Sequence, residues 1–391
     1  TNTLANTFTA TSTLSSANFT AGVSTTIRIK STQYNYVYDE VEVMLDSGYT
    51  EGLYMVAIKT GAVGTKFAMT SNNIGETWVE NDEGQNNLVS VALNEDGSYG
   101  LIGGYRRLMT IKNNVVSTTF YDSTNNNFLD VAISKNGQYM LAVGSGGTSI
   151  IKVSRDYGLT WSSYGSGGEW FGCDMSESGQ YMVVVSSAWS RKARFSNDYG
   201  ETWVEANGLG AQNYVAMSTD GSKVYTFAYD GANDVGIKWT NNGQTRTVII
   251  SGEGGTDFGI DSTGQIILRS QGGTTRQLRL STNYGSSWSS VGGNADYWGR
   301  ISVSGNGQYA IASPSYSGGT TLRLSQYPFT TWNVINITKN WQKTNISYSG
   351  KYMLASHSTG VYISKDYGAN WTDLSFASDA YWGDVEISSI R

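Results

Sequence analysis

The stretch "SRDYGLTW" at residues 154–161 returns with small changes along the chain, and this repetition decides the fold. Close copies are "SNNIGETW" at 71–78, "SNDYGETW" at 196–203, "STNYGSSW" at 281–288 and "SKDYGANW" at 364–371. Weaker copies are "TNNGQTR" at 240–246, "SQYPFTTW" at 325–332 and an eroded stretch at 112–119. The period is close to 42 residues, as between Trp161 and Trp203, and it yields eight repeats. A period of this length is typical of propeller blades.

A second pattern recurs in step with the octapeptide. "DVAISKNGQYMLAVG" from Asp130 and "CDMSESGQYMVVVSS" from Cys173 each join two apolar runs through a polar turn that contains glycine. This pattern predicts a β-hairpin. A third short strand, the octapeptide turn and a fourth strand follow each hairpin. We therefore predict an all-β protein, a β-propeller of four-stranded antiparallel blades with eight blades in the ring.

The octapeptide has the residues that a tight, repeated turn needs. We expect its aspartate to accept hydrogen bonds from backbone N–H groups, its glycine to adopt a positive φ, and its tryptophan to fill the wedge between neighbouring blades. Asn73 and Asn283 replace the aspartate in two repeats, and we expect each to lose one turn hydrogen bond. The residues assigned to these structural roles are Asp156, Gly158, Trp161, Asp198, Gly200, Trp203, Gly285, Trp288, Asp366, Gly368 and Trp371.

These octapeptides resemble the Asp-box, the bacterial neuraminidase repeat of sialidase-like propellers. The resemblance covers most of the chain and implies the propeller fold, but many Asp-box proteins are not sialidases, because a fold does not determine a function. A sialidase site would need three arginines, a tyrosine nucleophile with a glutamate, an acid/base aspartate and an early Arg-Ile-Pro motif. The chain has "TIRIK" at 26–30 without the proline, and no such tyrosine, glutamate and aspartate set can be placed.

The two ends of the chain raise the question of how the ring closes. "GDVEIS" at 383–388 reads as a first strand with no partner strands after it. We predict that it pairs into the first blade and closes the ring, which removes exposed sheet edges. A competing assignment gives that place to "EVEVML" at 40–45. We predict a propeller over 49–391 and a Thr/Ser/Asn-rich extension over 1–48 that is an arm, stalk or docking segment, or simply a partly ordered end.

Composition excludes several classes of function. The net charge is −6 and only 15% of residues are charged, so we expect no nucleic-acid partner. No apolar stretch is long enough for a membrane-spanning helix. Because Cys173 and His357 are single, we expect no metal site built from several such residues, and we expect no cofactor. Abundant Ser, Thr, Asn, Gly and Tyr favour an extracellular, cell-surface or virion-surface location.

The loops on the face opposite the octapeptide turns carry the candidate ligand site. Bulky aromatic residues precede several first strands, and arginines lie beside aromatic residues in the second-to-third-strand loops, as in "GGYRR" at 103–107. Such aromatic rings either stack on sugars or cap the core of a blade, and the arginines either bind carboxylate or sulfate groups or are solvated loop charges. The candidate ligand-binding residues are Trp170, Trp189, Arg194, Arg269, Tyr297, Trp298, Arg300, Tyr316, Trp341, Tyr381 and Trp382.

Three hypotheses of function follow. The first is a non-catalytic, surface-displayed propeller that binds a glycan or a surface protein through this face. The second is a sialidase-like glycoside hydrolase with paired carboxylates near the central ends of first strands, and the candidates are Glu169, Asp174, Asp257, Asp296 and Asp384. The third is a protein-interaction or assembly scaffold that forms a homo-oligomer or joins a particle through residues 1–48.

Overall fold

In the computed structural model the chain divides into two compact units, Thr1–Gly52 and Leu53–Arg391. In the first unit, β1 (Thr25–Lys30) pairs antiparallel with β2 (Val37–Val43). Residues 40–43 therefore belong to this hairpin and do not supply the inner strand of a blade. The structure describes residues 25–30, 37–43, 53–60, 68–81, 87–124, 126–146, 151–165, 169–186, 192–208, 212–229, 234–252, 257–271, 277–292, 298–314, 321–374, 376 and 381–388.

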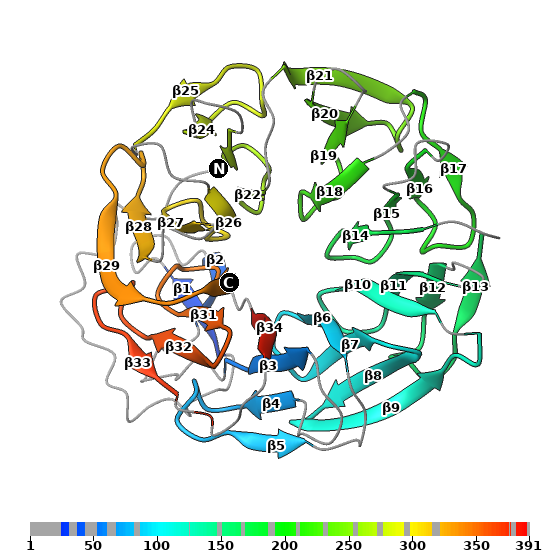
Figure 1. Cartoon of the computed structure of the whole chain (residues 1–391), viewed down its shortest axis with the longest axis horizontal. Helices are drawn as coiled ribbons and strands as arrows, with labels where there is room; N and C mark the ends of the chain where they lie inside the picture. The colour runs from blue at the N-terminus through cyan, green and yellow to red at the C-terminus, as the bar shows by residue number, and fades with distance from the viewer. Residues whose placement is uncertain are drawn as a thin grey trace. The chain divides into compact units, whose positions relative to one another are not determined.

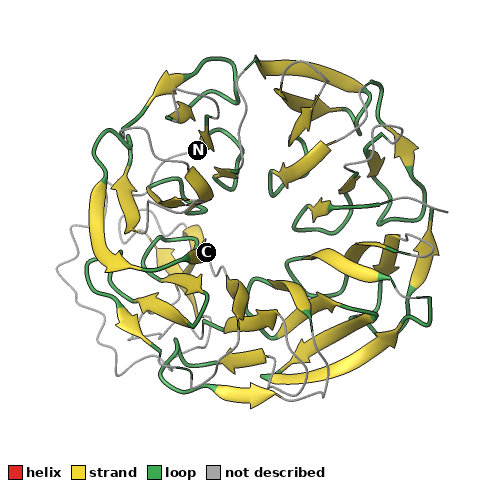
Figure 2. Cartoon of the chain, viewed as in Figure 1, coloured by secondary structure: helices red, strands yellow, loops and turns green. Residues whose placement is uncertain are grey.

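The second unit is a ring of eight blades, each a sheet of four antiparallel strands, as predicted (Figure 1). Figure 2 shows strands and loops throughout the described part of the ring. No helix in the described residues is long and apolar enough to cross a membrane.

Blades 2 to 8 each use four consecutive strands. In each blade the first strand lies at the central channel and the fourth lies at the rim. Blade 2 is β6 (Leu88–Leu93), β7 (Tyr99–Gly104), β8 (Arg107–Lys112) and β9 (Val115–Tyr121); blade 3 is β10 (Asn127–Ile133), β11 (Met140–Ser145), β12 (Ile151–Ser154) and β13 (Ser162–Tyr164); blade 4 is β14 (Gly172–Met175), β15 (Met182–Val185), β16 (Arg194–Ser196) and β17 (Val204–Glu205). Blade 5 is β18 (Gln212–Met217), β19 (Val224–Tyr229), β20 (Asp234–Thr240) and β21 (Thr245–Ser251); blade 6 is β22 (Phe258–Ile260), β23 (Ile267–Ser270), β24 (Leu278–Ser281) and β25 (Ser289–Ser290). Blade 7 is β26 (Trp298–Val303), β27 (Tyr309–Pro314), β28 (Thr321–Gln326) and β29 (Asn333–Thr338); blade 8 is β30 (Trp341–Ile346), β31 (Met353–His357), β32 (Gly360–Ser364) and β33 (Thr372–Asp373).

Blade 1 joins the two ends of the propeller, which confirms the predicted closure. Its inner strand is β34 (Tyr381–Ile387), followed by β3 (Met55–Thr60), β4 (Ala68–Ser71) and β5 (Val79–Asn81). The register between β3 and β34 runs from Met55 opposite Ile387 to Thr60 opposite Tyr381. The side chains of Trp382, Val385 and Ile387 are 0–1% exposed in one core with those of β3 and blade 8. This pairing joins the first and last strands of the second unit and so closes the ring.

The octapeptide turn is a closed network of hydrogen bonds. The Ser154 hydroxyl donates to the Asp156 carboxylate (2.8 Å) and accepts from the Gly158 N–H (2.9 Å), while Asp156 also accepts from the Thr160 N–H (2.9 Å). Gly158 has φ 81°, and its carbonyl accepts from the indole N–H of Trp161 (3.1 Å). The same contacts recur in the turns that begin at Ser196 and Ser364.

The two asparagine-containing turns keep the hydrogen bonds of the side chain that replaces aspartate, so the expected loss at that position is wrong. Their tryptophans differ, because the Trp78 indole N–H has no hydrogen-bond partner among the described residues and that of Trp288 donates to the Ile249 carbonyl (2.9 Å). The Asn73 side-chain oxygen accepts from the Thr77 N–H (3.0 Å), and its amide nitrogen donates to the Thr77 hydroxyl (2.8 Å). Asn283 makes the same two contacts with Ser287. In the turns of Asp156 and Asp198 the threonine hydroxyl donates to the carboxylate instead. A hydroxyl both donates and accepts, so it reverses its role when the carboxylate becomes an amide.

Blades 2 and 5 replace the octapeptide with a tight asparagine turn, and their outer strands are long. Asn113 and Asn114 have φ 49° and 69°, and Asn241 and Asn242 have φ 52° and 51°. Paired positive φ values follow the twist of the flanking strands, so the strands stay paired over their length. β9 and β21 are each seven residues long, whereas the outer strands after intact octapeptides have two or three. In blade 2 the long outer strand therefore ends with Tyr121 on the face opposite the octapeptide turns.

The face that bears the octapeptide turns is tied together around the ring. Backbone N–H groups in the hairpin turns donate to carbonyls in the next blade, for example from Lys135 to Glu177 (2.8 Å) and from Glu177 to Thr219 (2.9 Å). Similar bonds link blades 2 to 3, 5 to 6, 6 to 7 and 7 to 8. Blade 1 has no such hairpin turn, because its two inner strands come from opposite ends of the unit. This face is therefore a rigid base.

Candidate functional site: the central channel and the variable face

A β-bulge near the start of six first strands decides which side chains reach the central channel. The register shifts by one residue in β6, β10, β18, β26, β30 and β34. In β26 the shift lies between Trp298, which is buried in the core, and Arg300, which lines the channel. A bulge re-aims the side chains on either side of it, and beyond it alternate residues face the channel.

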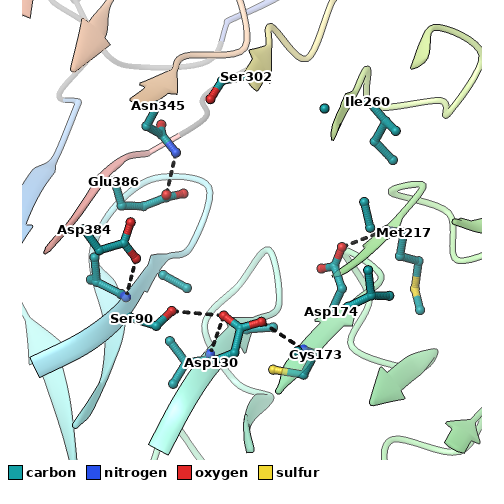
Figure 3. A pocket seen from close by; sticks show the side chains of 18 of the residues that line it. Ser90, Asp130, Cys173, Asp174, Met217, Ile260, Ser302, Asn345, Asp384 and Glu386 are labelled. Carbon is teal, nitrogen blue, oxygen red and sulfur yellow. Dashed lines mark hydrogen bonds between the residues drawn. The ribbon is translucent and has the colours of Figure 1, made fainter. Parts of the chain in front are cut away.

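The channel has a volume of about 1060 Å³ and is lined by the first strands of all eight blades. Figure 3 shows carboxylates from several blades directed toward its centre. The charged side chains supplied by the first strands or the residue just before them are those of Asp130, Asp174, Asp257, Arg300, Lys343, Asp384 and Glu386. Carboxylates outnumber cations in this set, so the channel wall is acidic.

Each of the four aspartates contributed by the first strands, or by the residue just before one, links its own blade to the next. Asp130 accepts from the Cys173 N–H (2.9 Å), and Asp174 accepts from the Met217 N–H (2.7 Å) (Figure 3). Asp257 and Asp384 accept in the same way from the Ile301 and Val91 N–H groups (2.9 and 3.1 Å). Each carboxylate also accepts from the N–H of the residue that follows it. These contacts assign the aspartates to holding adjacent blades together.

The enclosing walls raise the pKa of the channel carboxyl groups. Burial, with a smaller contribution from neighbouring carboxylates, raises the pKa of Asp130 to about 6 and that of Asp174 to about 7. Burial and the nearby Asp384 hold the pKa of Glu386 well above its usual value. Lys343, whose ammonium lies 3.8 Å from the Asp384 carboxylate, has a raised pKa because of that partner. The channel therefore holds protons on some of its carboxyl groups near neutral pH.

The stability of Asp174→Asn relative to that of the wild type is expected to rise progressively as the pH rises from 5 to 7. The folded protein keeps the Asp174 proton up to about pH 7, whereas the unfolded chain loses it near the ordinary pKa of 3.8. The wild type therefore loses stability across this window through Asp174, and Asp174→Asn does not lose that contribution. The difference in free energy of unfolding between the two, measured by urea titration, grows up to pH 7 and then levels off.

Asp198→Asn is the matched control for this experiment. Hydrogen bonds within its turn lower the pKa of Asp198 despite partial burial, so its titration lies below the window. Its difference from wild type stays constant between pH 5 and 8. A difference for Asp174→Asn that is flat or decreasing over the same range would contradict the assigned protonation.

Four of the five candidate tryptophans are packed in the blades. Trp170, Trp298, Trp341 and Trp382 are 0–5% exposed. Cationic groups cover some of their rings: Arg194 lies 5.5 Å from the Trp170 ring centre. Arg323 and Lys59 cover Trp298 and Trp382 at 5.4 and 4.8 Å. In this structure these rings cap the blade cores, which is the alternative interpretation, and they do not form an open stacking ring. Three of them directly precede a bulge, which turns them away from the channel.

The candidate arginines differ in their surroundings. Arg194 stacks on Trp170 and pairs with Glu205 at 3.3 Å. Arg269 is 0% exposed, donates to the Ser270 carbonyl (3.0 Å) and covers Phe227. Arg300 lines the channel and donates to the carbonyl of Gln342. Trp189, Tyr297 and Tyr316, together with the side chain of Tyr381, lie outside the described residues.

Sequence reasoning missed Asp130, Lys343 and Glu386 in the channel. The signal was present, because channel residues lie two or four positions before the first turn residue of the hairpin. Asp130 precedes Ser134 by four residues, and Glu386 precedes Ser388 by two. In the described residues no group of three or more His, Cys, Asp or Glu side chains is arranged to hold a metal ion.

The face opposite the octapeptide turns has connections of very different length. Two residues, Tyr105 and Arg106, join β7 to β8, and two join β31 to β32. Eight residues, 186–193, join β15 to β16, and seven join β23 to β24. We call this side the variable face. Exposed aromatic residues here include Tyr105 (45%), Tyr121 (54%) and Phe171 (40%), the last at the channel mouth.

Comparison with known proteins establishes the fold alone. The sequence matches no known family model and no curated protein. Among solved structures, a chain of Kuenenia stuttgartiensis hydrazine synthase is 11% identical, with a TM-score of 0.54 over 73% of this chain and 94% of that one. The Myceliophteria thermophila Cps50 (Swd1) β-propeller domain is 12% identical, with a TM-score of 0.54 over 72% and 98%. YCF48 from Cyanidioschyzon merolae is 14% identical, with a TM-score of 0.51 over 72% and 93%. The chain is similar to these proteins as a β-propeller.

Proposed function

We propose that this protein is a non-catalytic binding propeller, displayed on a cell or particle surface, that recognises carbohydrate through the variable face. The observation that carries the proposal is the contrast between the two faces. On one face, the turns between the first and second strands of blades 2 to 8 have five or six residues and are joined by hydrogen bonds from blade to blade, whereas the connections on the other face have two to eight residues. Loops of diverse length on a rigid base are the usual arrangement of a recognition surface.

Exposed aromatic rings on the variable face support a carbohydrate ligand. Tyr105, Tyr121 and Phe171 each present 40% or more of their surface to solvent. Aromatic planes suit the C–H faces of sugar rings, and tyrosine adds a polar group. The channel aspartates are each engaged by two backbone N–H groups, which supports a structural role for them over acid/base chemistry.

A glycan array tests this proposal. We expect the purified protein to bind a defined subset of glycans, and the Phe171→Ser variant to lose at least tenfold in apparent affinity. Leu159→Ser is the control, because Leu159 is 78% exposed on an octapeptide turn at the other face. If binding survives Phe171→Ser and Tyr121→Ser but is lost in Leu159→Ser, the ligand binds the face of the octapeptide turns, which would contradict the proposal. An array without specific binding would contradict a carbohydrate ligand.

A protein partner is the second candidate, favoured by an apolar arc at the channel mouth. Val89, Leu129 and Phe171 come from three consecutive blades and line the channel where the first strands begin. An apolar arc beside polar and charged residues suits a peptide side chain. A role of residues 1–48 in assembly on a particle belongs to the same candidate. A blank glycan array with well-folded protein would favour it.

A further inference from the structure

We propose that Arg107, with Tyr105 and Tyr121 beside it, forms a subsite for the carboxylate group of an acidic saccharide. This inference deepens the proposed function and rests on it, since it names the ligand class at one place on the variable face. The residues come from the short β7–β8 connection, the start of β8 and the end of β9 in blade 2. We call them the blade 2 patch.

The patch is built on a rigid turn. The Tyr105 N–H donates to the Asn87 carbonyl (3.0 Å), and the Arg106 N–H donates to the Asn126 carbonyl (2.8 Å). The Asp122 N–H donates back to the Arg106 carbonyl (2.7 Å). These bonds tie the turn to the segments on both sides of it. The side chains it carries are therefore displayed on a fixed backbone, which lowers the entropy lost on binding.

Arg106 has a backbone conformation that residues other than glycine rarely adopt. Its φ is 62°, a left-handed value for which glycine or asparagine is usual in a two-residue turn. Its guanidinium group donates to the carbonyls of Asp122 (3.0 Å) and Ser123 (3.4 Å) and lies 5.0 Å from the Tyr121 ring centre. Arg106 thus clamps the segment after β9 and holds Tyr121 in place.

The guanidinium group of Arg107 makes no ion pair with a carboxylate of the described residues. It stands directly opposite Tyr121 in the β8–β9 pairing, with its guanidinium 5.5 Å from that ring centre. The carboxylate of the nearby Asp122 instead accepts from the Thr124 N–H and from the Asn126 amide. Elsewhere in the described residues, Arg155 and Arg194 pair with glutamates at 3.1 and 3.3 Å. The guanidinium group of Arg107 is thus kept open in a chain of net charge −6.

The chemistry of these groups selects the ligand. A guanidinium that lies over an aromatic ring keeps its N–H edge for a planar acceptor, and that of Arg107 lies over Tyr121. That edge matches the two oxygens of a carboxylate. Tyr105 and Tyr121 expose 45% and 54% of their surface next to it, enough to contact the C–H face of a sugar ring. A uronic-acid or other carboxylate-bearing sugar satisfies both contacts at once.

The test measures binding of oligogalacturonate, its methyl ester and a sulfated oligosaccharide to the full-length protein by calorimetry. We expect the carboxylate form to bind at least tenfold more tightly than the methyl ester. Arg107→Gln loses at least tenfold in affinity for the carboxylate form, and Arg107→Lys recovers only part of it, because an ammonium lacks the fork. Arg246→Gln, which removes an exposed arginine on the rim of blade 5, is the matched control and binds like wild type.

The outcomes separate this inference from the proposed function. Equal affinity for the acid and its ester, a wild-type affinity of Arg107→Gln, or an equal loss in Arg246→Gln overturns the subsite. Binding of the sulfated oligosaccharide alone also overturns it, because the geometry is assigned to a carboxylate. If other glycans on the array still bind and depend on Phe171, the proposed function stands while the blade 2 patch is discarded. Unfolding curves of both arginine variants that match wild type exclude loss of fold as the cause.

Discussion

Deleting residues 381–391 is expected to abolish cooperative folding of the propeller. The deletion removes β34, and with it the fully buried side chains of Trp382, Val385 and Ile387. Each such side chain contributes about 1.5–3 kcal/mol when buried. The loss also leaves β3 with an open edge and removes the bond from the Val91 N–H to Asp384. The total is comparable with the whole stability of an ordinary domain, about 5–15 kcal/mol. Urea unfolding followed by tryptophan fluorescence measures the effect.

A shorter deletion provides the control. Removing only residues 389–391 keeps β34 and Ser388, whose hydroxyl accepts from the Tyr54 N–H (3.0 Å). This variant should unfold at the same urea concentration as wild type. A synthetic peptide of residues 381–388, added to the longer deletion, should restore part of the cooperative transition. If the longer deletion unfolds like wild type, the pairing of β34 with β3 does not hold the ring closed.

The Gly179→Ala substitution is expected to destabilise the protein by about 3–5 kcal/mol, within the range of overpacked and strained sites. Gly179 lies in a hairpin turn of blade 4 with φ 74°, and a Cβ there would stand 2.5 Å from Cδ2 of Tyr139 in blade 3. Tyr139 cannot move away freely, because its ring stacks on that of Tyr199 with centres 4.6 Å apart. The clash therefore adds to the cost of a positive φ. Chemical denaturation of the two proteins gives the difference.

The Gly165→Ala substitution separates the cost of a positive φ from the cost of the clash between blades. Gly165 has φ 77°, but its nearest contact is the tip of the Arg194 side chain, at 3.0 Å from the added Cβ. A flexible tip can shift, so this variant should lose only the backbone contribution of about 1 kcal/mol. An equal loss in the two variants would show that the contact between blades at Tyr139 contributes nothing.

The period, the turn and the ring closure could all be predicted from the sequence, because they rest on local chemistry. A hairpin turn needs its glycine, and the octapeptide needs the serine, aspartate and glycine that bond to one another within eight residues. Closure followed from one unpaired strand pattern at 383–388. The hydrogen bonds of Asn73 and Asn283 could not be read in this way, because they depend on which way a hydroxyl points.

The site depended on tertiary structure. The residues before the first strands looked like a ring of sugar-binding tryptophans, but one inserted residue in the strand turns Trp298 inward and brings Arg300 to the channel. The sequence "GGYRR" likewise does not reveal that the Arg107 guanidinium is available to a ligand. This depends on Arg106 and Asp122 making their hydrogen bonds with other groups. Local sequence determined which strands and turns form, since these are settled by near neighbours in the chain. The direction and pairing of individual side chains were decided by residues far apart in the chain, which meet only in the closed ring.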